Sequence, residues 1–350
     1  MNTKSLKLII SIILILIVSC DEPETVVTNI IHPDGSVTRK IEMRKKDNKF
    51  KITDIQVPLD STWAIADSCE ISLKGDTTWI KRAVKDFKNV EELNLAYKTD
   101  SGCNSNLKRN ASFSKRFRWF NTIYRFSETI LNRFKYGSPV SEFLTKDELQ
   151  WFYSPSGDNE ARLNGPDSLR YKSLSDTIDK KKDEWFFRTI VSEWVGEFSE
   201  QLGPNTERDM CPDSLKKKEN ILLDIIKAHG DDIDSLWNSG YILNEFIGES
   251  NSLKYRAEAD SAMDIVEDRI LLRFVGYSVR ILMPGKLISS NGFADSSQLL
   301  VWPVNDEYFL TEPYEMWAES KVPNIWAWIV SAIFIVFVAT GIIVRKKKRD

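Results

Sequence analysis

Apolar residues gather in two uninterrupted runs, one near each end of the chain. The first run covers residues 8–18 and follows Lys4 and Lys7. A basic start before an apolar stretch of this length is typical of a secretory signal. The second run covers residues 325–344 without a charge, and five consecutive basic residues follow it. Twenty helical residues give about 30 Å, the thickness of the hydrocarbon core of a bilayer, so this run predicts a membrane-spanning helix.

The first run ends in Leu16-Ile17-Val18-Ser19-Cys20, which resembles the lipobox of bacterial lipoproteins. The resemblance implies that a signal peptide, residues 1–19, is removed and that Cys20 is acylated on its sulfur and its amino group. Radioactive palmitate should then label the protein. The alternatives are an ordinary signal peptide and a short uncleaved helix, although the run is short for a membrane span. Asp21 and Glu22 follow Cys20, and an acidic residue there resembles an inner-membrane retention signal.

The flanks of the second run predict its orientation. Trp326 and Trp328 lie at one end, and indole rings prefer the membrane interface. Residues 345–350 carry the basic cluster at the other end, which predicts a cytoplasmic tail. A buried core helix is the alternative, but it would not be expected to end in five cations. We therefore predict a transmembrane helix at 324–344 in a bacterial inner membrane, with a periplasmic, doubly anchored ectodomain.

Alternation of polar and apolar residues predicts a β-rich segment at residues 20–140. Residues 24–43 predict a hairpin that turns at Pro33-Asp34-Gly35, and residues 78–87 predict a further strand. Asn89 predicts the cap of a short helix. Residues 113–134 leave helix and strand open, because their aromatic residues fall on one helical face although such residues favour strands. We predict a long strand here, with a turn at residues 137–139.

The spacing changes to that of helices in residues 141–268. Thr145-Lys146-Asp147-Glu148 resembles a capped helix start, residues 154–159 predict a loop, and residues 186–202 carry a broad apolar stripe that ends at Gly203. Further helices are predicted from Asp213 to His229, over 232–246 and over 255–267. Strands return in residues 269–323. The predicted fold class is α+β: the two β-rich segments form one sheet, and the helical block is an insertion.

One segment carries a family resemblance. Residues 284–292, Pro-Gly-Lys-Leu-Ile-Ser-Ser-Asn-Gly, and then Leu299-Leu300-Val301-Trp302 resemble a strand-turn-strand element of the LppM-type bacterial lipoprotein domain. That family also has an acylated cysteine at the front and a single helix at the back. The resemblance implies a β-rich domain that binds or handles envelope lipids. The helical block departs from the compact family pattern, and no functional residue is carried across.

Charge and composition exclude several classes of function. Net charge is −3 overall; subtracting +2 for Lys4 and Lys7 and +4 for the tail leaves −9 for the ectodomain. Such an acidic domain argues against nucleic acid as a partner and against broad adhesion to anionic lipid. The two histidines, His32 and His229, lie in a predicted turn and at a predicted helix end. No phosphate loop or zinc motif occurs, so we predict no cofactor, no metal and no catalytic residue.

The cysteines leave alternatives open. Besides Cys20, the chain has Cys69, Cys103 and Cys211, an odd number for an oxidising compartment. We predict a candidate disulfide between Cys69 and Cys103, because both lie in the β-rich amino-terminal part. Cys211 would then be free or would pair with a partner. Buried free thiols are the alternative for all three.

A short motif recurs: Asp, then Ser or Thr, then an aliphatic residue, Ala or Thr. It resembles the acceptor motif of a periplasmic O-glycosylation system, which would add bulk and solubility to the surface. Helix caps and turns also place Asp before Ser, and both interpretations stay open. The candidate glycosylation positions are Ser61, Thr77, Ser168, Thr177, Ser214, Ser235 and Ser261.

Three functions follow from these patterns. The first is a non-enzymatic envelope lipoprotein that binds a lipid or protein partner. The second is an accessory subunit of an inner-membrane complex, with small residues such as Ala339 and Gly341 forming the assembly surface of the helix. The third is a carboxylate-based hydrolase that acts on envelope glycan. The lack of a catalytic signature favours the first.

Overall fold

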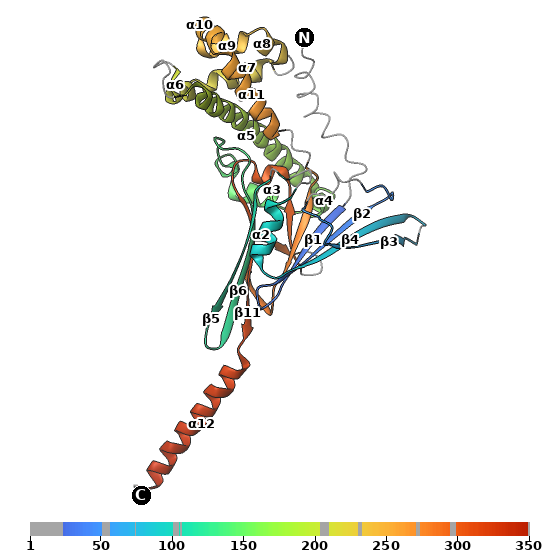
Figure 1. The fold of residues 1–350 in the computed structure, drawn as a ribbon, viewed down its shortest axis with the longest axis vertical. Coiled ribbons are helices and arrows are strands. Elements are labelled where there is room, and N and C mark those ends of the chain that lie inside the picture. Colours follow the sequence, from blue (N-terminus) through green and yellow to red (C-terminus); the bar gives the residue numbers. More distant parts are fainter. Residues whose placement is uncertain are drawn as a thin grey trace.

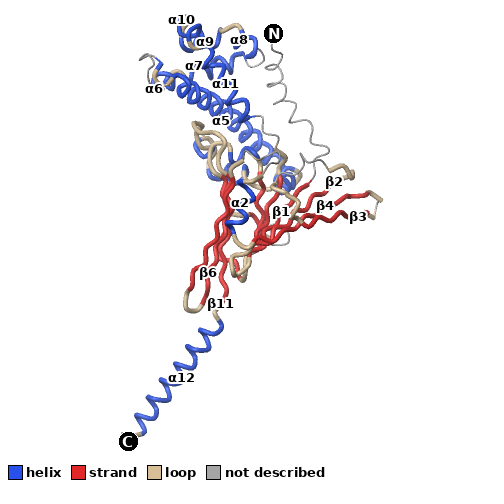
Figure 2. The backbone as a smooth tube through the Cα atoms, in the orientation of Figure 1, coloured by secondary structure: helices blue, strands red, loops and turns tan. Residues whose placement is uncertain are grey.

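The computed structural model describes residues 24–50, 57–73, 75–100, 105, 107–203, 210–229, 233–270, 274–294 and 299–348. These residues form three parts that follow one another along the long axis of the molecule (Figure 1). A single helix lies at one end, two β-sheets lie in the middle, and a group of helices lies at the other end. Most helices are separate from the strands (Figure 2), so the predicted α+β class is confirmed.

The larger sheet has seven strands, and its centre joins the two flanks of the sequence. β1 pairs with β2 as the predicted hairpin and pairs in parallel with β7 on its other side. The spatial order is β3 (Ala64–Ile71), β4 (Thr77–Phe87), β2 (Val37–Lys45), β1 (Glu24–Ile31), β7 (Tyr277–Leu282), β10 (Leu300–Val304) and β9 (Phe293–Ala294).

The smaller sheet has four strands and also joins both flanks. β6 and β11 pair antiparallel over their full length, from Asn121 opposite Pro323 to Ile130 opposite Tyr314. The flanks therefore combine as predicted, but in two sheets rather than one. The reason is that each sheet has one apolar face, which must be buried against another layer. The order is β5 (Arg109–Phe117), β6 (Asn121–Ile130), β11 (Tyr314–Pro323) and β8 (Lys286–Ser290).

The prediction of one long strand in residues 113–134 is wrong. Strand is the correct type, but the segment folds back as the β5–β6 hairpin. Arg118 and Asn121 exchange two backbone hydrogen bonds, of 2.8 and 3.1 Å, across a tight turn at Trp119 and Phe120. This turn contains no glycine, proline or Asn-Gly pair, which are the usual signals for a hairpin, so the sequence gives no sign of it.

The helices next to the sheets begin where the sequence predicts. Asn89 caps α2 (Val90–Lys98) by accepting a hydrogen bond from the amide of Glu92. Thr145 and Glu148 form a capping box at the start of α3 (Lys146–Phe152). The predicted loop at residues 154–159 is partly wrong, because α4 (Ser156–Leu163) begins inside it. α5 (Ser168–Leu202) ends at Gly203, whose φ of +71° suits glycine.

The rest of the helical block is more finely divided than predicted. The helix predicted from Asp213 to His229 is two helices, and Asp213 lies in the first turn of α6 while Cys211 holds the cap position. The helix predicted over 232–246 is interrupted at Gly240, with φ of +80°. The elements are α6 (Pro212–Lys217), α7 (Glu219–His229), α8 (Ile233–Asn238), α9 (Tyr241–Ile247), α10 (Glu249–Lys254) and α11 (Arg256–Ile270).

Two hydrophobic cores stabilise these parts. The first lies between the sheets and includes Val27 and Phe126, and it continues to Trp185 in the first half of α5. The second lies within the helical block and includes Trp194 and Phe246. The long helix α5 contributes to both cores, so it ties the helical block to the sheets.

The last helix, α12 (Ile325–Lys347), projects from the sheets by itself (Figure 1). Among the described residues it is the one helix long and apolar enough to cross a membrane, with a mean hydropathy of 2.6. Only 6% of its most apolar window is buried. The alternative of a buried core helix is therefore wrong.

Candidate membrane-proximal interface

The tip of the β5–β6 hairpin is hydrogen-bonded to the start of α12. Asn324 is the single residue between β11 and α12. Its Nδ2 donates to the carbonyl oxygens of Arg118 (2.7 Å) and Trp119 (3.2 Å), and its amide donates to the carbonyl of Phe120 at 2.9 Å. Thr122 Oγ1 donates to Asn324 Oδ1 at 2.9 Å. The helix therefore leaves the sheet through a fixed joint instead of a free linker.

Five aromatic side chains surround this joint. The ring centroids of Phe117 and Trp119 lie 6.2 and 5.3 Å from that of Trp326. The rings of Phe120 and Trp328 lie 4.4 Å apart. All five rings are also exposed, Trp119 by 48%. We call these five residues the aromatic collar. Indole rings favour the level of lipid headgroups, so the collar marks the height at which α12 would enter a bilayer.

The hairpin tip reaches past the start of the helix. Trp119 Nε1 donates a hydrogen bond to Ser331 Oγ at 2.9 Å. Ser331 follows Ile325 by six residues, which correspond to about 9 Å along a helix. The tip of the hairpin therefore lies beside the first turns of α12, where a spanning helix passes from the headgroups into the hydrocarbon.

Exposed basic side chains lie close to the aromatic collar, on the same hairpin and on the neighbouring strands. Lys115, Arg116 and Arg118 on the hairpin are exposed, as are Lys286 at the start of β8 and Lys321 near the end of β11. Lys286 and Lys321 are paired residues of neighbouring strands. The end of the sheets that adjoins α12 therefore carries these exposed cations, although the chain between the two apolar runs is acidic as a whole.

A buried polar cluster joins the two sheets higher up. Glu128 of β6 lies 3.1 Å from Arg39 Nη2 of β2, and it accepts hydrogen bonds from Asn29 (3.1 Å) and Tyr97 (2.8 Å). Burial alone would raise the pKa of Glu128, but the charge of Arg39 and the Tyr97 hydroxyl outweigh burial and lower it. All four side chains are buried. The cluster therefore fixes one sheet against the other and does not meet a solute.

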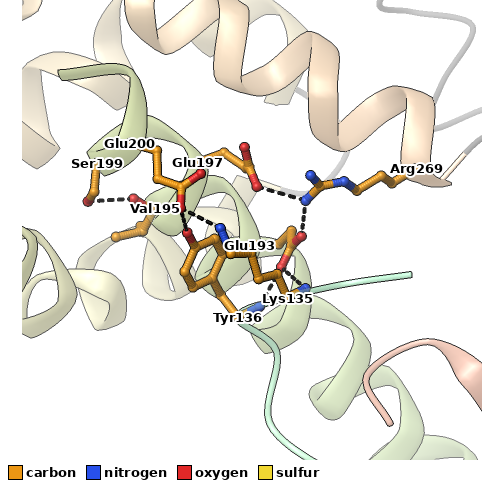
Figure 3. A network of polar contacts seen from close by, with 8 residues as sticks. All are labelled: Lys135, Tyr136, Glu193, Val195, Glu197, Ser199, Glu200 and Arg269. Carbon is orange, nitrogen blue, oxygen red and sulfur yellow. Dashed lines mark hydrogen bonds and ion pairs between the residues drawn. The ribbon is translucent and has the colours of Figure 1, made fainter. Parts of the chain in front are cut away.

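A second polar network holds the helical block to the smaller sheet (Figure 3). Glu193 of α5 is fully buried and accepts hydrogen bonds from the backbone amides of Lys135 (2.8 Å) and Tyr136 (2.7 Å), just after β6. Arg269 of α11 is hydrogen-bonded to Glu193 and, at 2.8 Å, to Glu197. One carboxylate thus joins three segments, so the helical block is a fixed extension of the sheets.

The cysteines predicted from the sequence do not gather at this interface. Cys20 and Cys103 lie outside the described residues, so acylation and the Cys69–Cys103 disulfide stay predictions. Cys69 is exposed on β3. Cys211 is half-buried and hydrogen-bonded to Ser214 at 3.2 Å, which lowers the pKa of its thiol.

The candidate glycosylation positions are spread over the ectodomain, and the motif stays a prediction. A turn accounts for the copy of the motif at Asp60, because the Asp60 side chain accepts a hydrogen bond from the amide of Thr62. It does not explain Asp260, which lies inside α11 and binds Arg256. Ser61, Thr177 and Ser235 are exposed, whereas Thr77, Ser168, Ser214 and Ser261 are half-buried.

The possible metal ligands of the described residues are scattered. No group of three His, Cys, Asp or Glu among them could hold a metal ion. His32 lies in the predicted turn, with Nε2 3.0 Å from Thr38 Oγ1. His229 ends α7 beside the ring of Tyr241. Both histidines thus occupy the structural positions that the sequence predicts.

Sequence reasoning missed the hairpin tip as a site. Its signal is the run Lys115-Arg116-Phe117-Arg118-Trp119-Phe120, in which basic and aromatic residues mix. This composition is typical of the membrane interface, but it stands about two hundred residues before the spanning helix. Only the pairing of β6 with β11 brings it next to Trp326.

Comparisons with known proteins place the chain in no family. No protein-family model matches it, and no curated protein matches it. Among solved structures, it is similar to the NMR structure of the folded domain of LppM from Mycobacterium tuberculosis, with 9% identity, over 87% of this chain and 91% of that chain. LppM is also the family that the sequence of residues 284–302 resembles. Its TM-score is 0.25, too low to support any inference about function.

Proposed function

We propose that this chain is a single-pass envelope lipoprotein of a bacterial inner membrane, with a periplasmic ectodomain, and that it acts by binding and not by catalysis. In this proposal the hairpin tip rests on the outer leaflet, and the helical block at the far end meets a protein partner. The observation that carries the proposal is the joint at Asn324, which leaves no flexible linker between β11 and α12.

A fixed joint sets the height and the orientation of the sheets and the helical block relative to the bilayer. The hydrogen bonds of Asn324 hold α12 to the hairpin, the polar cluster around Glu128 holds sheet to sheet, and Glu193 holds the helical block to β6. The helical block therefore stands at one distance from the bilayer. Such a distance matters to a protein that meets another envelope protein, whereas a catalytic domain that acts on a diffusing substrate does not require it.

The surface of the helical block suits a protein partner. Leu253 on α10 is 79% exposed, and Ile221 and Tyr241 are also exposed. Aromatic and aliphatic side chains of this kind supply the buried centre of protein interfaces. They lie on the part of the molecule that is farthest from α12 (Figure 1).

An accessory subunit of a membrane complex is the second candidate. It is favoured by one face of α12 on which Thr340 and Gly341 lie close to Phe337 and Val344. Small residues on one face let two membrane helices approach closely. In that case the sequence of α12 itself would be required, and not only its attachment.

Photo-crosslinking in native membranes tests the proposal. A photo-reactive residue replaces Leu253 in the full chain, and crosslinked partners are identified by mass spectrometry. Inserting six Gly/Ser residues between Pro323 and Asn324 should reduce the dominant crosslink several-fold. The same insertion between Ser72 and Leu73, in an exposed turn far from α12, is the control and should leave it unchanged.

Three outcomes separate the candidates. An unrelated spanning helix in place of residues 332–344, which spares Ser331 and its hydrogen bond with Trp119, should preserve the crosslink if the joint is what matters. Loss of the crosslink on that replacement would favour the accessory subunit. No specific crosslink from Leu253, or equal yields from both insertions, would contradict the proposal.

A further inference from the structure

The charge of the ectodomain is strongly segregated. Residues 107–127 contain six basic residues, Lys108, Arg109, Lys115, Arg116, Arg118 and Arg125, and no Asp or Glu. The same ectodomain carries a net charge of about −9 by composition. An evenly acidic protein would be repelled by an anionic membrane, so the placement of these cations decides how this one meets its bilayer.

Within the described residues, the cations at the hairpin tip form no ion pair with a carboxylate. Within the described part of the chain, no carboxylate lies within 4 Å of Arg116 or Arg118, and both side chains are exposed. Lys115 is also exposed, and its Nζ donates a hydrogen bond to the carbonyl of Pro33, at 3.2 Å, and lies over the ring of Tyr124, so its charge has no carboxylate partner among the described residues. These three charges are therefore available to an external anion.

Neighbouring strands extend this basic surface. Lys286 and Lys321 are exposed and paired across β8 and β11, at the end where β11 joins α12. Leu287 and Ile288, next to Lys286, are 42% and 45% exposed. Cations beside exposed apolar side chains match a lipid surface, which offers phosphate groups above hydrocarbon.

The hairpin fixes the height of these charges. Arg118 precedes Trp119, which is hydrogen-bonded to Ser331 of α12, and Arg116 lies next to Phe117 of the aromatic collar. If the collar lies at the interface, both guanidinium groups lie at the level of lipid phosphates. A guanidinium group binds phosphate through paired hydrogen bonds.

We infer that Arg116 and Arg118, with Lys115, bind the headgroups of anionic phospholipids in the outer leaflet, and that the aromatic collar enters the interface beside them. This inference rests on the proposed placement of the hairpin at the membrane and adds the class of lipid. The net acidity of the ectodomain does not prevent this binding, because attraction to a surface acts within about 10 Å and the nearest charges dominate.

Hydrogen exchange measured on the full chain in nanodiscs tests the inference. Backbone amides of residues 116–121 are followed by mass spectrometry in discs of phosphatidylcholine alone and in discs with phosphatidylglycerol added. We expect these amides to exchange at least threefold more slowly with phosphatidylglycerol at low salt, and the difference to vanish in 1 M salt. The basic tail after α12 does not affect this readout, because it lies at the opposite leaflet.

Matched variants identify the cations. Arg116→Gln/Arg118→Gln should abolish the difference between the two lipid compositions. Arg170→Gln/Lys172→Gln removes the same charge from exposed positions of α5 and should preserve it. Equal exchange in both lipids would overturn the inference, as would an equal loss in the two double variants.

Two further arms separate the explanations. Inorganic phosphate added to phosphatidylcholine discs should have no effect; slowing by free phosphate would overturn the assignment to lipid. Hairpin amides that are protected in both kinds of disc relative to detergent, without a lipid difference, would sink this inference and leave the proposed function standing. Amides that are no more protected in discs than in detergent would sink both.

Discussion

Glu128 carries a buried charge, and its ion pair with Arg39 and its hydrogen bonds with Asn29 and Tyr97 offset the cost of burying that charge. Its side chain is fully buried, and so is that of Arg39. Removing one member of such a pair leaves the other uncompensated, which typically costs about 3–5 kcal/mol. We expect Glu128→Ala to lower the free energy of unfolding by about that amount, measured by urea denaturation of the full chain in detergent.

A surface ion pair provides the control. Glu315 lies 3.6 Å from Arg125, and both side chains are about half exposed. Exposed pairs contribute about 0–1 kcal/mol, so Glu315→Ala should change the free energy of unfolding by less than 1 kcal/mol. Similar losses in Glu128→Ala and Glu315→Ala would contradict the structural role of the polar cluster.

Glu148 predicts a dependence of stability on pH. Hydrogen bonds from Lys181 Nζ and from the amide of Thr145 lower the pKa of its carboxyl. A carboxyl whose pKa is lower in the folded state stabilises above its unfolded pKa of about 4.3, and this stabilisation is lost as pH falls through the folded pKa. The melting temperature should therefore fall less steeply below about pH 4.3 in Glu148→Gln than in the unchanged protein. Parallel curves from pH 7 to pH 3 would contradict the assignment.

At the scale of elements, α5 depends on a glycine in its interior. A Cβ on Gly196 would lie 2.2 Å from Cδ2 of Tyr136, so the ring lies directly on the helix backbone. Gly196→Ala gains about 1 kcal/mol of helix propensity, but overpacking typically costs about 1–3 kcal/mol. Because moving the ring would break the hydrogen bond that its hydroxyl donates to Glu200, we expect net destabilisation.

The measurement is urea unfolding of single and double variants. Gly196→Ala should lower the free energy of unfolding, and Tyr136→Ala/Gly196→Ala should lose less than the sum of the two single changes, because the clash exists only when both side chains are present. An additive double variant would show that Tyr136 and Gly196 do not press on each other.

Elements with local signals were predictable, and elements that depend on distant partners were not. The capping box at Thr145 and the hairpin around Gly35 are encoded within a few residues, and both are confirmed. The break at Gly240 was missed, because a helix pattern with a glycine inside it is compatible with one helix or two. The β5–β6 turn was missed because it lacks the usual turn residues, and part of its hydrogen bonding is with Asn324, two hundred residues away.

At the scale of the whole molecule, the carboxyl end of β1, at Ile31, is nearer to α12 than its amino end, at Glu24. Ile30 pairs with Leu282, and the chain continues from there to Lys286, which pairs with Lys321 next to α12. Glu24 therefore begins β1 at the distal end. The eight residues of β1 cover about 23 Å, whereas the segment from Cys20 to Glu24 reaches about 14 Å at most.

This geometry restricts the predicted double anchoring. An acyl chain on Cys20 enters the same bilayer as α12 only if the start of β1 leaves the sheet. We expect amides of residues 24–27 to exchange hydrogen faster in the acylated full chain than in a Cys20→Ala variant that is exported by an ordinary signal peptide. Residues 81–84 of β4, which pair with β2 and β3 and not with β1, serve as the internal reference.

Equal exchange in the two forms has a clear meaning. If palmitate labels Cys20 and β1 stays protected, the two anchors do not share a bilayer. If palmitate does not label Cys20, the lipobox interpretation is wrong and α12 is the anchor by itself. Faster exchange in residues 81–84 would indicate general destabilisation in place of local detachment.

The sequence by itself determined the features that depend on composition and short-range order. An uncharged apolar run long enough to cross a bilayer and the apolar spacing of residues 186–202 depend on nothing outside their own segments. The tertiary structure alone decided how the flanks divide into two sheets, how Glu193 joins three segments, and how the hairpin tip meets Trp326. These contacts join residues that are tens to hundreds of positions apart, and their stability comes from burial and pairing that no local pattern encodes.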